Sequence, residues 1–195
     1  GRGGSATAAV SGSIAPVNDL PVAADASFAT NEDVALSGRL PAAVDADNDA
    51  VTYAAGTTTP ANGRVAINPD GTFTYTPNAD VSGTDRFSYV VSDGRGGTSE
   101  YYVTVAIAPV NDAPVSTPLP DRMRIDGQSV SFDAAAYFSD VDGDRLSFTA
   151  VGLPPGLTIS PAGLVSGTID RNASQGGPSG NGTYTVTVTA DDGRG

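Results

Sequence analysis

The chain has 195 residues, a formal net charge of −12, and neither cysteine nor histidine. This composition excludes disulfides, thiolate nucleophiles, zinc sites of the Cys/His type and a Ser-His-Asp triad. The acidic excess disfavours nucleic acid and anionic membranes as partners and favours cations, and no apolar run approaches the roughly 18 residues of a membrane-inserted helix. A hydrophobic content of 39% is sufficient for a folded core.

Two nearly identical strings occur in the chain, APVNDLPV at 15–22 and APVNDAPV at 108–115. Asn18 and Asn111 are 93 residues apart (111 − 18), about the length of a small domain, which predicts linkers between tandem domains. Residues 5–17 match 98–110 at the same offset. We therefore expect residues 1–17 to be the closing strand of a preceding repeat, 18–110 a first repeat, and 111–195 a second repeat that lacks its last strand.

The first repeat alternates short apolar runs with turn residues. RVAINPDGTFTYTP at 64–77 predicts a hairpin with a Pro-Asp-Gly turn, and 84–94 and 100–109 predict two further strands. The alternation places these residues on inward faces: Val65, Ile67, Phe73, Tyr75, Phe87, Tyr89, Val91, Tyr101, Val103, Val105 and Ile107. Tyr102 points to the opposite face.

The second repeat follows the first with variation. LTISPAGLVSG at 157–167 corresponds to the hairpin, 183–193 predicts a strand with Val186 and Val188 on one face, and 132–140 allows one helical turn at most. The order of these segments predicts an all-β chain of two tandem β-sandwiches with Greek-key connections.

Acidic residues cluster at matching positions of the two repeats. DADND contains Asp45, Asp47 and Asp49, and DVDGD contains Asp140, Asp142 and Asp144. Three carboxylates at every second residue repel one another unless a cation lies among them. Hard oxygen ligands without His or Cys favour calcium over transition metals, and flexible carboxylate geometry favours it over magnesium.

The loop sequences allow other interpretations. One is a solvated acidic loop whose Asp and Asn residues form turns. An EF-hand is excluded, because Gly56 and Val151 occupy the positions that require a bidentate Glu, and the nonapeptide GGxGxD pattern of calcium-binding rolls is absent.

The linker VNDAP, the acidic pair in DVD and the strands ending in SDG or ADDG resemble cadherin repeats. The first repeat is similar to the cadherin-like repeats of bacterial surface adhesins, and the second to dystroglycan-type cadherin-like or immunoglobulin-like modules of the same proteins. In the cadherin family, such residues hold calcium at domain junctions. Carried over by position, the central junction would use Glu32, Asp85, Asn111, Asp112, Asp140, Asp142 and Asp192. An upstream junction would use Asn18, Asp19, Asp45, Asp47 and Asp93.

Two positions depart from the family pattern. Gln128 replaces the counterpart of Glu32 in the second repeat, and Tyr184 lies opposite Asp85. The resemblance implies a calcium-binding repeat, at the cell surface or secreted, that extends and rigidifies a bacterial adhesin in cell adhesion or biofilm formation. Its partners would be neighbouring repeats of the parent protein.

Two further functions are compatible with the sequence. One is a calcium-dependent module that binds carbohydrate such as exopolysaccharide, for which exposed Tyr102 is a weak signal. The other is an accessory domain of a secreted polysaccharide-degrading enzyme. The sequence contains no activated nucleophile, paired catalytic carboxylates or phosphate loop, and we expect no enzyme activity from the chain itself.

Overall fold

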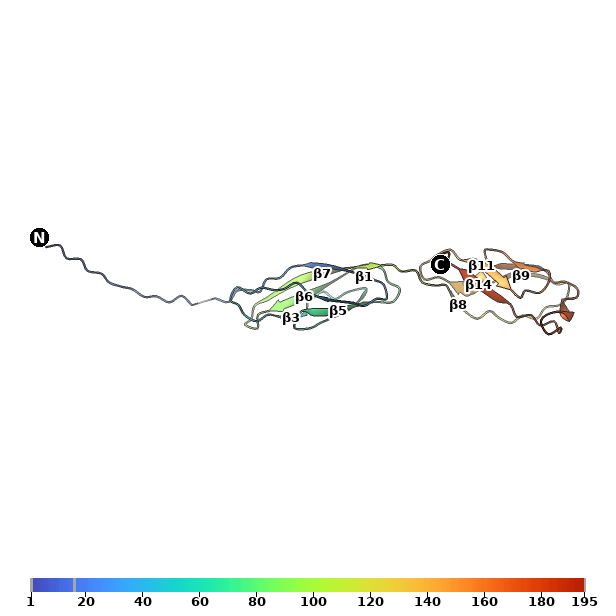
Figure 1. Cartoon of the computed structure of the whole chain (residues 1–195), viewed down its shortest axis with the longest axis horizontal. Coiled ribbons are helices and arrows are strands. Elements are labelled where there is room, and N and C mark those ends of the chain that lie inside the picture. The colour runs from blue at the N-terminus through green and yellow to red at the C-terminus, as the bar shows by residue number, and fades with distance from the viewer. Residues whose placement is uncertain (1, 16, 195) are drawn as a thin grey trace. The chain divides into compact units, whose positions relative to one another are not determined.

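The computed structural model describes residues 2–15 and 17–194, which divide into two compact units, 1–109 and 110–195. Each unit is built from β-strands and connecting turns (Figure 1). The chain is therefore an all-β protein of two tandem β-sandwiches, as the sequence predicts. Among the described residues, the helical elements are two three-residue 3₁₀ turns, and no helix is long and apolar enough to cross a membrane.

The first unit consists of two sheets. The larger sheet has the order β1 (Ala26–Asn31), β7 (Thr98–Ala108), β6 (Gly83–Ser92) and β3 (Thr52–Ala55), and the smaller has the order β2 (Leu36–Arg39), β5 (Thr72–Pro77) and β4 (Gly63–Ile67). Strand β1 is parallel to β7, whereas β6 pairs antiparallel with β7 along the whole length of β6. The predicted hairpin is confirmed as β4 and β5, with Val65 opposite Tyr75.

The core of the first unit consists of aromatic and β-branched side chains from both sheets. Period-two alternation directs one face of each strand inward. The fully buried residues include Phe73, Tyr75, Phe87, Tyr89, Val91, Val103 and Val105, and the partly buried Tyr101 packs against them. The predicted core is confirmed. Gly71, at φ 83°, forms the hairpin turn, where an added Cβ would come within 3.2 Å of the Tyr53 ring.

The second unit contains shorter strands. The largest sheet has the order β12 (Leu157–Ile159), β13 (Leu164–Thr168) and β9 (Ser129–Asp133), so the predicted hairpin at 157–167 is confirmed. Two-stranded pairs join β8 (Val115–Ser116) to β10 (Phe138–Ser139), and β11 (Ser147–Val151) to β14 (Thr187–Asp191). The 3₁₀ turn η1 (Ala135–Tyr137) agrees with the single turn expected in 132–140, and η2 spans Ala173–Gln175.

One predicted strand is shorter than expected. The strand at 183–193 is observed only as β14, from Thr187 to Asp191, so Val188 belongs to it and Val186 does not. The residues before Thr187 have no strand partner among the described residues.

The N-terminal segment contains no strand over the described residues 2–15, all of which are exposed. Gly1 and Pro16 lie outside the described residues. That 1–17 closes a preceding repeat therefore stays a prediction, as do the exact limits of the two repeats.

Candidate calcium sites

In each unit, a short strand pairing brings the linker beside an acidic loop. Val22 forms an isolated antiparallel bridge with Val44, immediately before the first triplet. In the second unit, β8 pairs with β10, immediately before the second triplet, with Val115 opposite Ser139. The repeated linker phrase therefore places its Asn-Asp pair next to the carboxylates in both units.

The first acidic loop is organised around Asp45. Its Oδ1 accepts hydrogen bonds from the backbone N–H groups of Asp47 (2.9 Å) and Asp49 (3.2 Å). The loop turns at Asn48, whose φ of 61° is in the left-handed region that Asn tolerates better than most residues. The Asp45 side chain is only 7% exposed, and its Oδ2 is buried without a hydrogen-bond partner among the described residues.

The linker completes this first cluster with two side-chain contacts. The backbone N–H of Asp19 donates to Asp47 Oδ2 at 2.8 Å, and Asn18 Nδ2 donates to Asp93 Oδ2 at 2.7 Å. The hydrogen bond from Asn18, followed by that from the backbone N–H of Arg95, lowers the pKa of Asp93 below its usual value. This carboxylate is therefore held in its ionised form.

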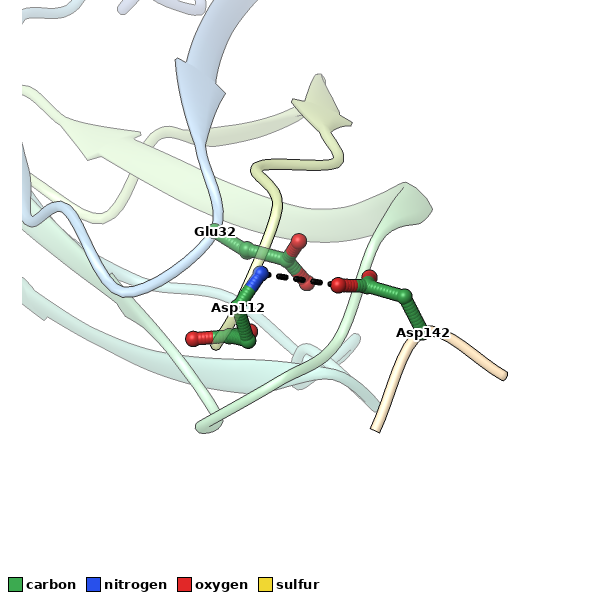
Figure 2. Close-up of side chains that lie close together, drawn as sticks. All are labelled: Glu32, Asp112 and Asp142. Atoms are coloured by element: carbon green, nitrogen blue, oxygen red, sulfur yellow. Dashed lines mark hydrogen bonds between the residues drawn. The ribbon is translucent and has the colours of Figure 1, made fainter. Parts of the chain in front are cut away.

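The second unit repeats this arrangement. The backbone N–H of Asp112 donates to Asp142 Oδ2 at 2.8 Å (Figure 2), and Asn111 Nδ2 donates to Asp192 Oδ2 at the same distance. The bond from Asn111 is the main cause of a lowered pKa of Asp192. Asp140 Oδ1 accepts from the N–H of Asp144, and Asp140 Oδ2 is again buried without a partner among the described residues.

Each site contains an arginine that sequence reasoning missed. Arg95 Nε contacts Asp49 Oδ1 at 2.6 Å, and an Nη atom of Arg194 contacts Asp144 Oδ1 at 2.8 Å. The signal was present in the sequence, since both arginines belong to the repeated string DGRG. These ion pairs engage the third aspartate of each triplet, so the first two aspartates are the better candidates for ligands.

The donor set fits a hard divalent cation. Within each triplet, one carboxylate oxygen from each aspartate lies within 4.8 Å of the others. A buried carboxylate oxygen without a donor carries an uncompensated desolvation cost, which a bound cation removes. Carboxylate and amide oxygens from loops are typical calcium ligands. A merely solvated acidic loop gives no reason for Asp45 Oδ2 and Asp140 Oδ2 to be buried at matching positions.

The geometry does not favour Asp85 as a ligand. It is buried in β6, where Oδ1 accepts from the N–H groups of Ala61 and Arg86, and Oδ2 accepts from the N–H of Asn62 and from the Tyr75 hydroxyl at 2.6 Å. Burial alone would raise the pKa of Asp85, but these hydrogen bonds outweigh it and lower the pKa. Both oxygens thus serve the fold of the first unit, and we omit Asp85 from the ligand set.

Glu32 follows β1 directly and is 4% exposed, and its backbone N–H donates to the carbonyl oxygen of Ala108 at 2.9 Å. Its role as a ligand stays a prediction. At the two departing positions, Gln128 Oε1 accepts from the N–H of Ile125, and the Tyr184 hydroxyl donates to the carbonyl oxygen of Ala173. Both side chains serve local structure in the second unit.

Tyr102 gives no support to a sugar-binding face. It lies on β7 on the side opposite the core, where the guanidinium of Arg86 stacks at 3.8 Å from the ring centroid. The stacked arginine covers one face of the ring that a sugar would need.

Comparisons with known proteins agree with this fold. Residues 18–109 match the family model described as "Bacterial cadherin-like domain", and residues 113–195 match that described as "Putative Ig domain". Among curated proteins, none is significantly similar to the chain in sequence.

The solved structures that are similar to this chain include cadherins. Mouse cadherin-23 EC22-24 is 18% identical with a TM-score of 0.57, over 90% of this chain and 59% of that one. Drosophila N-cadherin EC1-4 is 16% identical with a TM-score of 0.55, over 90% of this chain and 46% of that one. The endo-fucoidan hydrolase MfFcnA4 from glycoside hydrolase family 107 is 21% identical with a TM-score of 0.39, over 89% of this chain and 27% of that one. The chain thus spans less than two thirds of each of these three structures.

Proposed function

We propose that this chain, a bacterial cadherin-like domain at 18–109 followed by an Ig-like domain at 113–195, is a calcium-binding repeat segment that stiffens a surface adhesin. Domains of these two families are adhesion-type repeats, usually extracellular, and typically structural and not enzymatic. We propose in addition that this chain binds calcium, is located at the cell surface or secreted, and acts in adhesion or biofilm formation.

The observation that carries the proposal is the pair of buried, unpartnered oxygens, Asp45 Oδ2 and Asp140 Oδ2. They occupy the same position in two loops that share a hydrogen-bonding pattern, a left-handed turn residue (Asn48 or Gly143) and an arginine contact. One unsatisfied buried oxygen in a surface loop could be a coincidence. Its recurrence at the equivalent position of a second loop argues against coincidence. A cation at each loop satisfies both oxygens.

Stiffening follows from where the linker residues lie. Asp19 and Asp112 belong to the linker phrases, and each already contacts the second aspartate of an acidic loop through its backbone. A calcium ion that binds the loop and the linker together would fix the linker to the body of its unit. The ion would thereby reduce the freedom of the chain at each linker.

Isothermal titration calorimetry with calcium tests the proposal, using Asp45→Asn and Asp140→Asn. Each substitution keeps the shape of the side chain and removes one ligand charge. Asp70→Asn and Asp170→Asn are the controls, because they remove the same charge from exposed turns outside the two clusters. We expect each cluster variant to lose one binding event and each control to retain both.

Magnesium provides a second comparison. It requires near-ideal octahedral geometry and dehydrates reluctantly, so we expect it to bind both sites much more weakly than calcium. Equal calcium heats in Asp45→Asn, Asp140→Asn and the unsubstituted chain would refute the proposed sites.

A further inference from the structure

The first and last strands of the first unit lie side by side and run in the same direction (Figure 1). Strand β1 pairs with β7 from Ala26 opposite Val103 to Asn31 opposite Ala108. The chain enters β1 from the linker phrase at 15–22 and leaves β7 into the linker phrase at 108–115. Any pull along the chain therefore acts on this unit through the start of β1 and the end of β7.

This arrangement determines how a pulling force acts on the pair. The force draws β1 backwards through its first residue and β7 forwards through its last. Because the strands are parallel, these two movements slide one strand past the other along their common axis. The evenly spaced hydrogen bonds of a parallel pair are then strained together. Strands that are pulled apart from the same end instead separate one bond at a time.

Two side-chain hydrogen bonds, here called the entry bonds, reinforce the end of β1 at which the force enters. The hydroxyl of Tyr89 on β6 donates to the backbone carbonyl oxygen of Ala24 at 2.6 Å. The backbone N–H of Tyr102 on β7 donates to Asp25 Oδ1 at 2.8 Å. A carboxylate acceptor makes the second bond stronger than one between neutral groups. Both bonds precede the strand pair in the chain, so a force on residue 24 strains them first.

The middle and the far end of β1 are also held. Phe28, in the middle of the strand, packs edge-on against Phe73 of the other sheet, with 4.9 Å between the ring centroids. The backbone N–H of Glu32 donates to the carbonyl oxygen of Ala108 at 2.9 Å, directly after the last strand pair. To slide along β7, β1 must therefore also withdraw an aromatic ring from its place between the sheets.

We propose that the first unit bears tension, with β1 and β7 as the load-bearing pair and the entry bonds of Asp25 and Tyr89 as its reinforcement. Forced unfolding is governed by the rate of unfolding and not by the equilibrium stability, so the direction of the force matters as well as the number of bonds. Neither the strand pair nor the entry bonds contain a residue of the two acidic loops. The unit therefore bears tension with or without calcium.

The direction of pulling provides the first test. The chain contains no cysteine, so thiol handles can be placed at chosen positions of the full chain. Ala24→Cys/Pro109→Cys attaches the handles before β1 and after β7, so that β1 slides along β7. Val34→Cys/Pro109→Cys keeps one handle and moves the other to the far end of β1, where the strands separate bond by bond. All three positions are exposed. In optical tweezers with chelator present, we expect a severalfold higher unfolding force from the first pair of handles.

Substitution of Tyr89 in the chain with handles at 24 and 109 tests the first entry bond. Tyr89→Phe removes the hydroxyl that donates to Ala24. At constant force, we expect the unfolding rate to rise roughly fivefold, as for one hydrogen bond that is lost before the unfolding barrier. Tyr101→Phe is the control, because the Tyr101 hydroxyl has no hydrogen-bond partner among the described residues. It should leave the rate nearly unchanged.

Substitution of Asp25 tests the second entry bond in the same chain. Asp25→Ala removes the acceptor of the Tyr102 N–H and should raise the unfolding rate at constant force by a similar factor. Asp25→Asn retains an acceptor oxygen at the same position and should restore most of the resistance. Denaturant unfolding of each variant reports the change in equilibrium stability separately.

Equal unfolding forces in the two pulling directions would overturn the load-bearing role of β1 and β7. Unchanged unfolding rates under force in Tyr89→Phe and Asp25→Ala, with reduced stability to denaturant, would overturn the role of the entry bonds. A rate in Tyr101→Phe as high as that in Tyr89→Phe would also overturn it, because the loss of any tyrosine hydroxyl would then suffice.

Discussion

The backbone N–H of Asp112 donates to Oδ2 of Asp142 at 2.8 Å, and the corresponding bond from Asp19 to Asp47 in the first unit has the same length. In both units, therefore, the aspartate of the linker is tied to the second aspartate of the acidic loop. The repeated phrase is part of the loop's hydrogen-bonded structure and is more than a spacer between two domains.

Arg95 should oppose calcium binding at the first site. Its guanidinium pairs with Asp49 but is largely exposed, so Arg95→Gln should cost at most about 1 kcal/mol of stability without calcium. The same change removes a positive charge beside the ion and releases a carboxylate. We expect calcium affinity measured by calorimetry to rise by up to about tenfold, equivalent to ~1.4 kcal/mol.

Arg64→Gln is the matched control, since it removes the same charge from an exposed position on β4. Its calcium affinity should remain close to that of the unsubstituted chain. A fall in affinity in Arg95→Gln would mean that the arginine supports the ligand geometry and does not compete with the ion.

Asp85 should act in stability and not in calcium binding. Tyr75 is fully buried and donates to Asp85, so Tyr75→Phe removes a donor from a buried carboxylate. Loss of a hydrogen bond to a charged group costs about 1.5–3 kcal/mol. Denaturant unfolding should show this loss, and calcium calorimetry should not change. Tyr101→Phe, on strand β7 of the other sheet, should cost less. Reduced calcium affinity in Tyr75→Phe would restore Asp85 as a candidate ligand.

The hydrogen bond from Asn18 gives the first unit a defined response to acid. The pKa of Asp93 is lower in the folded state than its ordinary value of 3.8, so the associated stability is fully present above that value. It is lost as the pH falls through the folded pKa. In Asn18→Ala, without calcium, the pKa of Asp93 measured by NMR titration should move upward, and acid unfolding should begin at higher pH.

Asn68→Ala is the control, because the Asn68 side chain donates to Thr72 and not to Asp93. It should leave the pKa of Asp93 unchanged. An unchanged pKa of Asp93 in Asn18→Ala would show that the N–H groups of Arg95 and Gly97 suffice to lower it.

Most of the fold could be predicted from alternation and turn chemistry. The strands containing Phe87, Val103 and Val165 were identifiable because period-two patterns and Gly-containing turns determine them locally. The short length of β14 could not be predicted, because residues 183–186 have a strand sequence. Residues 187–191 pair with β11, whereas residues 183–186 have no strand partner among the described residues.

The candidate sites were predictable in part. The recurrence of the Asn-Asp phrase and the aspartate triplets identified Asp45, Asp47, Asp140 and Asp142, and the structure places each pair beside its linker. The ion pairs of Arg95 with Asp49 and of Arg194 with Asp144 could not be predicted, because their partners are far apart in sequence and only the fold brings them together. The hydrogen bond from Tyr75 to Asp85 could not be predicted either, because the sequence does not show which side chains meet in the interior of the first unit.

The role of Glu32 as a ligand is a prediction that rests on the family resemblance alone. If the prediction is correct, Glu32→Gln should weaken calcium binding at the site that contains Asp112, and leave the site at Asp45 unaffected. Glu100→Gln is a suitable control, because Glu100 accepts hydrogen bonds from Ser88 and Thr57 outside the acidic loops. If calorimetry of Glu32→Gln shows unchanged calcium affinity at the site that contains Asp112, Glu32 is removed from the ligand set.

Thermal unfolding in calcium and in chelator tests the central claim most directly. Binding to the folded state alone adds about 2.7 kcal/mol at a calcium concentration one hundred times Kd, and extracellular sites typically have Kd values of about 0.1–1 mM. Calcium at about 10 mM, which is about 10–100 times these Kd values, should therefore raise the Tm by several degrees, and the double variant Asp45→Asn/Asp140→Asn should lose this rise. Superimposable melting curves of the unsubstituted chain in calcium and in chelator would contradict the account.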